Sequence, residues 1–215
     1  MTARTAACPN CGATIEFRWS GAVQSICPYC KAVLVRRDVD LEKVGTVSDL
    51  PPTSSPIQLG TEGRWKNDPF TVVGRIVYAY DRGGWNEWYL RTASGASAWL
   101  SDAQGDLAVS TPANDAGPLP APGELAVGQS YAIDGILFHV ASLTRARYAG
   151  VEGELPFESW DRHEALFADL DTEGKGAELR FATIDYSDLP PAVYVGTYVE
   201  LDDLAPRNLR RFEGW

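Results

Sequence analysis

The sequence predicts a mostly β protein, in which an N-terminal zinc ribbon precedes an antiparallel all-β body. The spacing of the cysteines predicts the ribbon. Runs of β-branched and aromatic residues, separated by turns rich in glycine and proline, predict the strands of the body. Helix should be scarce and limited to short turns near Trp160–Asp169 and Leu201–Leu204.

The chain has four cysteines, arranged as two C-x-x-C pairs with fifteen residues between the pairs. They are Cys8 and Cys11 in CPNCG, then Cys27 and Cys30 in CPYCK. Each C-x-x-C turn directs two thiolates at one point, and two such turns supply the tetrahedral ligands of a structural zinc. Disulfides or a redox pair fit less well, because a redox C-x-x-C normally opens a helix, whereas Gly12 and a strand-like run follow the first pair. Such a site suits iron as well as zinc, and it leaves no open position for a substrate.

Metal binding and the start of the chain both bear on location. Thiolates must be reduced to bind metal, which favours the cytoplasm. The first residues, MTARTAA, have no apolar core, so we expect no secretory signal. No transmembrane segment is expected either, because even the apolar run Tyr131–Leu143 is interrupted by Asp134 and His139.

Composition shifts divide the chain into modules. A segment rich in Pro, Ser and Thr follows the ribbon and is typical of a linker. A second break holds four prolines and three glycines and divides the body near its middle. The expected modules are the zinc ribbon (1–43), the linker (44–60), a first β half (61–110), a connecting loop (111–128), a second β half (129–205) and a C-terminal tail (206–215).

The two β halves share a short pattern. Phe70-Thr-Val-Val-Gly74 aligns with Tyr131-Ala-Ile-Asp-Gly135, each having an aromatic residue, an aliphatic residue two positions later and then a glycine. Glycine inside a strand often marks a bulge or tight bend that curls a small sheet into a barrel. This pattern favours two similar barrel-like halves, and it leaves open whether they share one core.

Charge is distributed unevenly and restricts the partners. The formal net charge is −10, but residues 1–43 carry 6 basic and 4 acidic residues (+2), whereas residues 44–215 carry 13 and 25 (−12). So acidic a body is repelled by phosphate backbones. Nucleic acid is therefore disfavoured as a partner of the body and stays open for the ribbon, and we expect a protein partner of unknown identity.

The W-x-E-W segment is a candidate ligand site. If it forms a strand, alternation places Trp85, Glu87 and Tyr89 on one face and Trp88 on the other. A carboxylate between aromatic rings is a good receptor for an ammonium or guanidinium group. The alternative is that the tryptophans fill the core and Glu87 pairs with an arginine such as Arg75 or Arg91. The full candidate site is Trp85, Glu87, Trp88, Asp185, Tyr186 and Asp188.

Two segments, Gly63–Leu90 and Phe181–Leu204, carry a family resemblance. The residues concerned are Phe70, Gly74, Arg75, Trp85, Glu87, Trp88, Trp99, Leu100, Asp185, Tyr186, Pro190 and Pro191. In these positions the chain resembles the bacterial domain-of-unknown-function 4178 family, in which a zinc ribbon ahead of the domain is a familiar arrangement. The resemblance implies no assigned activity. It implies an accessory role, in an envelope-stress or polyamine-related context.

Catalytic patterns are weak. The two histidines, His139 and His163, lie in no nucleophile motif, and the thiols are committed to metal. We therefore expect a non-catalytic accessory protein whose acidic, aromatic body recognises a protein or cationic partner. The competing hypothesis is an enzyme acting on a cationic substrate such as a polyamine, with Glu87, Asp185 and Asp188 as acid or base groups. A third is nucleic-acid binding through the ribbon.

Overall fold

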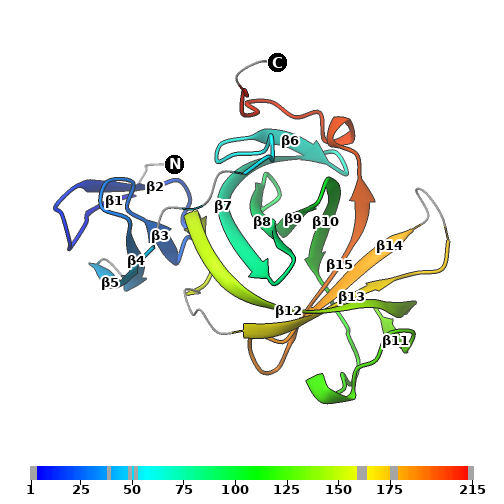
Figure 1. Ribbon diagram of the computed structural model, residues 1–215. Helices are drawn as coiled ribbons and strands as arrows, with labels where there is room; N and C mark the ends of the chain where they lie inside the picture. The colour runs from blue at the N-terminus through cyan, green and yellow to red at the C-terminus, as the bar shows by residue number, and fades with distance from the viewer. Residues whose placement is uncertain are drawn as a thin grey trace.

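The computed structural model describes residues 4–37, 40–47, 50, 53–158, 164–174 and 179–212. It shows a small N-terminal β module beside a large ring of antiparallel strands (Figure 1). This confirms the predicted fold class, a mostly β protein with a cysteine ribbon ahead of an antiparallel body. In this part of the chain no helix is long and apolar enough to cross a membrane.

The N-terminal module consists of a hairpin and a three-stranded meander. The hairpin pairs β1 (Arg4–Ala7) with β2 (Thr14–Phe17). The meander comprises β3 (Gln24–Ile26), β4 (Ala32–Arg37) and β5 (Asp40–Thr46). Strand β5 crosses the boundary that the sequence analysis set between residues 43 and 44.

The body contains ten strands and two short 3₁₀ turns among its described residues. They are β6 (Glu62–Trp65), β7 (Asp68–Tyr80), β8 (Gly83–Thr92), β9 (Ser97–Ala103), β10 (Asp106–Pro112), η1 (Pro122–Glu124), β11 (Ser130–Ile133), β12 (Ile136–Leu155), β13 (Glu164–Asp171), β14 (Arg180–Asp185), β15 (Ala192–Val199) and η3 (Leu201–Leu204). The turn expected near 201–204 is thus present as η3. Residues 164–169, by contrast, lie in strand β13 and not in the expected turn, whose first residues fall outside the described ones.

Eight of the strands close into one barrel. Their order is β7, β8, β9, β10, β15, β14, β13, β12, and β12 pairs back onto β7. Leu107 pairs with Val199 across β10 and β15, and Tyr148 pairs with Tyr78 across β12 and β7. The two β halves therefore build a single ring together. Eight-stranded barrels have an interior just wide enough for side chains or one small ligand.

Glycine provides a bend at one of the two aligned positions. Gly74 lies at a register shift between β7 and β8, and a Cβ there would lie 2.1 Å from the carbonyl oxygen of Glu154. Gly135 instead lies in the tight turn between β11 and β12, with a φ of 73° that follows Asp134 at 50°. The similarity of the two sequence segments thus does not extend to their structures.

Much of the apolar core lies on the outside of the ring. Trp88, Leu90 and Leu100 point outward from β8 and β9 and are covered by Ile57 and Leu204. A second outer cluster on β12–β15 includes Phe138, Val140, Leu166, Leu170 and Ile184, and the region around β11 covers it. Because these strands bury apolar residues outward, their inward positions are free to carry polar and aromatic side chains.

Candidate functional site

The four cysteine sulfurs form a compact cluster. The Cys8 and Cys30 sulfurs are 3.7 Å apart, as are those of Cys11 and Cys27, and all four lie within 4.8 Å of one another. All four are free thiols. Four sulfurs about 2.3 Å from a central ion form a tetrahedron with edges of about 3.8 Å, so the cluster has the dimensions of a four-thiolate metal site.

Two equivalent turns build this cluster. The Gly12 N–H donates to the Cys8 carbonyl at 2.8 Å, and the Lys31 N–H donates to the Cys27 carbonyl at 3.0 Å. Gly12 and Lys31 both adopt positive φ, at 75° and 58°. A side-chain hydrogen bond with Asn10 is the main cause that lowers the pKa of the Cys30 thiol to about 6. The pKa of the neighbouring Cys11 thiol is instead raised despite a backbone hydrogen bond with Ala13, because desolvation and the other three thiols disfavour its thiolate. A metal ion bound here would therefore displace protons from the cluster.

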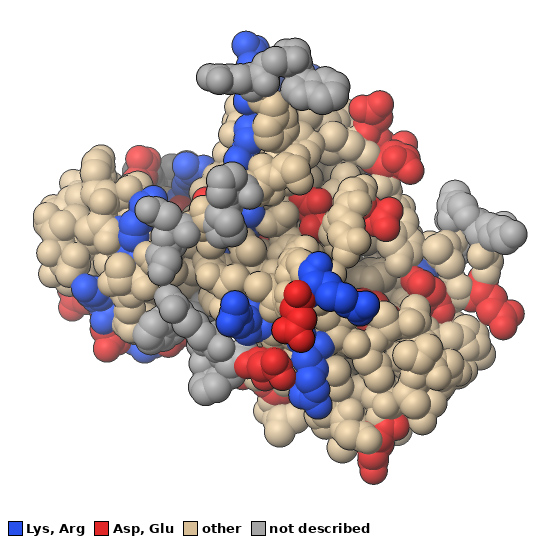
Figure 2. Space-filling model, in the orientation of Figure 1, with Lys and Arg blue, Asp and Glu red and all other residues tan. Residues whose placement is uncertain are grey.

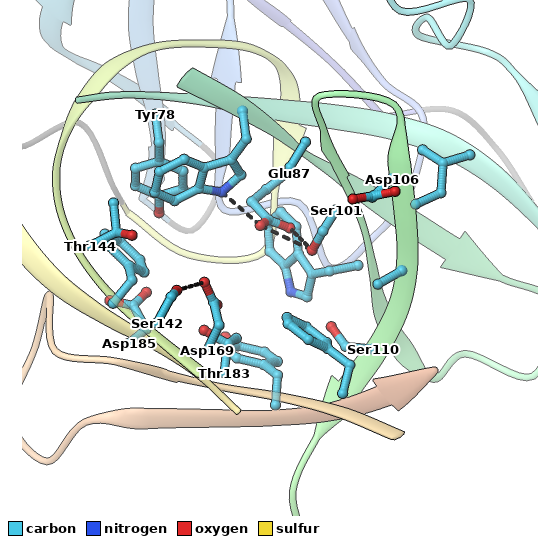
Figure 3. A pocket seen from close by; sticks show the side chains of 18 of the residues that line it. Tyr78, Glu87, Ser101, Asp106, Ser110, Ser142, Thr144, Asp169, Thr183 and Asp185 are labelled. Carbon is cyan, nitrogen blue, oxygen red and sulfur yellow. Dashed lines mark hydrogen bonds between the residues drawn. The ribbon is translucent and has the colours of Figure 1, made fainter. Parts of the chain in front are cut away.

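The barrel interior contains a partly open cavity of about 400 Å³ (Figure 3). Its lining comes from all eight ring strands, together with Gln104 and Phe157. The volume falls within the range of about 300–1,000 Å³ that is usual for small-molecule sites. The labelled acidic and hydroxyl side chains in Figure 3 point into this space.

Glu87 is the central polar group of the cavity. Its Oε1 accepts the indole N–H of Trp85 at 2.9 Å, and the Ser101 hydroxyl lies 2.8 Å from its Oε2. Burial raises the pKa of Glu87 to about 8, although these hydrogen bonds lower it in part. The nearby carboxylates of Asp169 and Asp185 raise it further. The Glu87 carboxyl group is therefore largely protonated near neutral pH.

Four more carboxyl groups line the same cavity, which are Asp106 on β10, Asp169 and Asp171 on β13, and Asp185 on β14. Desolvation raises the pKa of Asp169, whose Oδ2 accepts the Ser142 hydroxyl at 3.0 Å. Desolvation also raises the pKa of Asp185, whose Oδ1 accepts the Ser187 N–H at 2.8 Å. The cavity thus holds several carboxyl groups whose charged forms are poorly solvated.

Aromatic rings form much of the remaining wall. Tyr78 stacks on Trp85 with centroids 4.9 Å apart, and Phe167 meets Trp85 edge-on at 5.3 Å. Phe181 and Tyr194 also line the space. None of the described residues lining the cavity is a lysine or an arginine. The cavity therefore combines acidic groups and aromatic faces without a basic side chain to neutralise them.

The residues of the predicted site divide between three places. Trp85, Glu87 and Asp185 line the cavity. Trp88 is fully buried on the outer face of β8, and Tyr186 packs in the outer cluster on β12–β15 and donates its hydroxyl to the Pro120 carbonyl at 2.9 Å. Asp188 lies exposed in the turn after β14, where its charge raises the pKa of Asp185.

The arginines considered as partners of Glu87 have other contacts. Arg75 Nη1 lies 3.1 Å from Glu152 Oε1 on the outer face, and its guanidinium covers the Trp88 ring at 4.8 Å. Arg91 donates to the Arg18 carbonyl at 3.1 Å. Within the described part of the chain, no lysine, arginine or histidine forms an ion pair with Glu87.

Some of the residues that line the cavity were not predicted from the sequence. Asp169, Ser101, Ser142 and Thr183 line it and were not identified as site residues. Ser101 and Asp169 carried one available signal, since each lies two residues after an inward-facing aromatic residue, Trp99 or Phe167. Their role depends on which strands face one another, which spacing along the chain does not reveal.

Charged residues on the visible surface are dispersed. Figure 2 shows acidic and basic side chains scattered over this face, without one broad patch of either sign. The acidic groups that line the cavity cluster against apolar walls inside the barrel and not on this surface.

Comparison with known proteins identifies the family. The model of "Domain of unknown function (DUF4178)" matches residues 58–201, which is more than half of the chain, so the chain belongs to this family. The match covers the ring strands and stops short of the cysteine ribbon. No curated protein and no solved structure matches the chain.

Proposed function

We propose that this protein is a non-catalytic binding module, whose barrel holds a small organic cation or a cationic group of a partner. The observation that carries the proposal is the cavity in which Glu87, Asp169 and Asp185 face aromatic walls, with no lysine, arginine or histidine among the described residues that line it. Buried carboxylates without a positive partner favour binding of a positive charge from outside. Aromatic faces add cation–π attraction.

Proton exchange is part of the proposed binding. Because its pKa is about 8, Glu87 carries a proton in a large share of empty molecules at neutral pH. A bound ammonium stabilises the carboxylate form, so Glu87 releases that proton on binding. The hydrogen bonds from Trp85 and Ser101 hold the carboxylate in place for the incoming donor.

An organic cation fits the cavity better than a divalent metal ion. Metal ions need several ligand atoms close together. Among the described residues, the cysteines form the one group of three or more such side chains that could hold a metal ion. The cavity carboxylates instead come from four strands, β8, β10, β13 and β14, and no three of those described lie close enough together to hold a metal ion. An extended ammonium compound such as a polyamine suits this arrangement.

The ribbon has a structural part in the proposal. Zinc is the ion that we assign to Cys8, Cys11, Cys27 and Cys30, because a closed four-thiolate tetrahedron is its usual structural site. The need for reduced thiolates supports a cytoplasmic location. We assign the protein an accessory role beside a protein partner in a bacterial envelope-stress or polyamine-related process, on the basis of its family resemblance.

Titration with spermidine tests the cation site. The zinc-loaded protein should show a saturable increase in melting temperature at physiological salt, and calorimetry should give a defined stoichiometry. Glu87→Gln should weaken binding at least fivefold. Asp202→Asn is the matched control, because Asp202 is an exposed acidic residue of η3 that does not line the cavity, so its loss should leave binding nearly unchanged. Equal losses in both variants, or binding that disappears at physiological salt, would show nonspecific attraction to an acidic surface.

An enzyme remains the second candidate, and one observation favours it. A carboxyl group with a pKa of about 8 is suited to general acid or base catalysis near neutral pH. In this alternative Asp169 takes the place that the sequence analysis gave to Asp188, since Asp169 lines the cavity beside Asp185. Mass spectrometry of spermidine and acetylated spermidine after prolonged incubation tests for turnover, and Glu87→Gln provides the inactive control.

A further inference from the structure

The loop that links the two cysteine pairs reaches the barrel. Trp19 lies midway along this loop, and its ring packs against Tyr89 of β8 with centroids 5.6 Å apart. Tyr89 in turn packs against Trp99 of β9 at 4.9 Å. Trp99 lines the cavity, and Tyr89 follows Glu87 by two residues on the same strand face. A continuous series of aromatic contacts therefore joins the ribbon to the cavity wall.

Barrel residues hold this loop at its backbone. The Arg18 N–H donates to Glu154 Oε1 at 2.8 Å, and Arg91 Nη1 donates to the Arg18 carbonyl at 3.1 Å. Further along, the Val23 N–H donates to the Leu155 carbonyl at 2.9 Å, where β3 pairs with the end of β12. Both sides of Trp19 are thus attached to the barrel.

The Trp19 ring itself is positioned by packing. Its indole N–H is buried and has no hydrogen-bond partner among the described residues. Gly21 lies directly beneath the ring, since a Cβ at that position would come within 2.0 Å of it. The ring position therefore depends on the conformation of the loop, whose two ends are fixed by the cysteine turns at Cys8–Gly12 and Cys27–Lys31.

We infer that Trp19 is a positioning residue for the cavity, and that metal at the cysteines and a ligand in the barrel are thermodynamically coupled through it. Metal holds the two turns together and fixes the loop. The loop then seats Trp19 against Tyr89, which supports Trp99 and the strand that carries Glu87. Coupling of this kind is reciprocal, so a cavity ligand also tightens metal binding. The ligand part of this inference rests on the proposed function, whereas the seating of Trp19 does not.

Hydrogen exchange of the full-length protein tests the seating of Trp19 without any ligand. In Trp19→Ala, amides of residues 85–101 should exchange at least tenfold faster than in the parent, while amides of β14 keep their protection. Trp19→Phe, which retains an aromatic ring, should restore much of the protection. Phe212→Ala is the control, since Phe212 is an exposed aromatic residue that belongs to none of the apolar clusters covering β8 and β9.

Metal content and spermidine affinity complete the experiment. Trp19→Ala should retain one metal ion per chain but bind it more weakly in chelator competition, and it should bind spermidine about tenfold more weakly. Unchanged exchange over residues 85–101 in a variant that keeps its metal would overturn the inference. The exchange of residues 85–101 could be faster in Trp19→Ala while neither the parent nor any variant binds spermidine. This result would support the role of Trp19 and reject the proposed function.

Discussion

Glu87 and Asp185 occupy opposite walls of the barrel. Glu87 lies on β8 and Asp185 on β14, and in the ring order these strands are four positions apart among eight. Both carboxyl groups have raised pKa values because the cavity desolvates them, and the charge of Asp185 adds to the effect on Glu87. The two groups thus act on one another through the space where a ligand would lie.

The raised pKa of Glu87 predicts a pH-dependent stability. Its pKa is about 8 in the folded protein against 4.5 for an ordinary glutamate, so the folded state binds the proton more tightly. The contribution of Glu87 to the free energy of unfolding must therefore fall as pH rises from about 4.5 to about 8. Urea denaturation at several pH values should show a shallower decline for Glu87→Gln than for the parent. Identical pH slopes would show that Glu87 is not desolvated.

The two tryptophans of the W-x-E-W segment should differ in effect. Trp88 is fully buried in the outer cluster beneath Arg75, so Trp88→Ala should destabilise the protein by about 3–5 kcal/mol. Because Trp88 does not line the cavity, Trp88→Phe should leave spermidine affinity nearly unchanged. Trp85→Phe should weaken binding, since it removes the indole N–H that donates to Glu87. Denaturation gives the stability and calorimetry gives the spermidine affinity of both phenylalanine variants. Weaker binding by Trp88→Phe than by Trp85→Phe would show that the two faces of β8 are wrongly assigned.

Gly74 should tolerate no side chain. A Cβ there would lie 2.1 Å from the Glu154 carbonyl oxygen, so Gly74→Ala must displace β12 from β7 or strain the bulge. We expect a loss of about 1–3 kcal/mol in the free energy of unfolding. Gly123→Ala is the control, because no heavy atom lies within 4 Å of a Cβ at that position. Equal stability of the two variants would contradict the close approach of β7 and β12.

Loss of one cysteine should release the metal. Cys27 is fully buried at the start of the second turn, and Cys27→Ser should remove one metal equivalent per chain. Atomic emission measures the stoichiometry and identifies the ion, while a visible absorption band would indicate iron in place of zinc. Full metal content in Cys27→Ser would show that the four sulfurs do not form the site.

The sequence predicted those features that depend on neighbouring residues. The C-x-x-C spacing located the sulfur cluster, and strand alternation placed Trp85 and Glu87 on one face and Trp88 on the other. Closure of the barrel was beyond such reasoning, because Tyr78 and Tyr148 pair across 70 positions of the chain. No local pattern indicates that pairing.

Asp169 shows why part of the cavity was missed. On β13 the outward residues Leu166, Ala168 and Leu170 are buried, and the inward residues include Phe167 and Asp169. Because both faces of the strand are covered, polarity does not alternate in the usual way, and the sequence led us to expect a short turn near Trp160–Asp169. Their burial follows from closure of the ring.

Binding of a cation in the cavity should release protons from Glu87. Glu87 is largely protonated below its pKa of about 8, and a bound ammonium favours the carboxylate. Calorimetry with spermidine at pH 7 in buffers of different ionisation enthalpy should therefore reveal proton release, which should diminish as the pH is raised above 8. Affinity should increase with pH over the same range, since less free energy is then spent in removing the proton. Glu87→Gln should bind with little release, while Asp202→Asn, a change to an exposed acidic residue outside the cavity, should behave like the parent. Binding without proton release in the parent protein would mean that the ligand does not contact Glu87, even if the affinity were high.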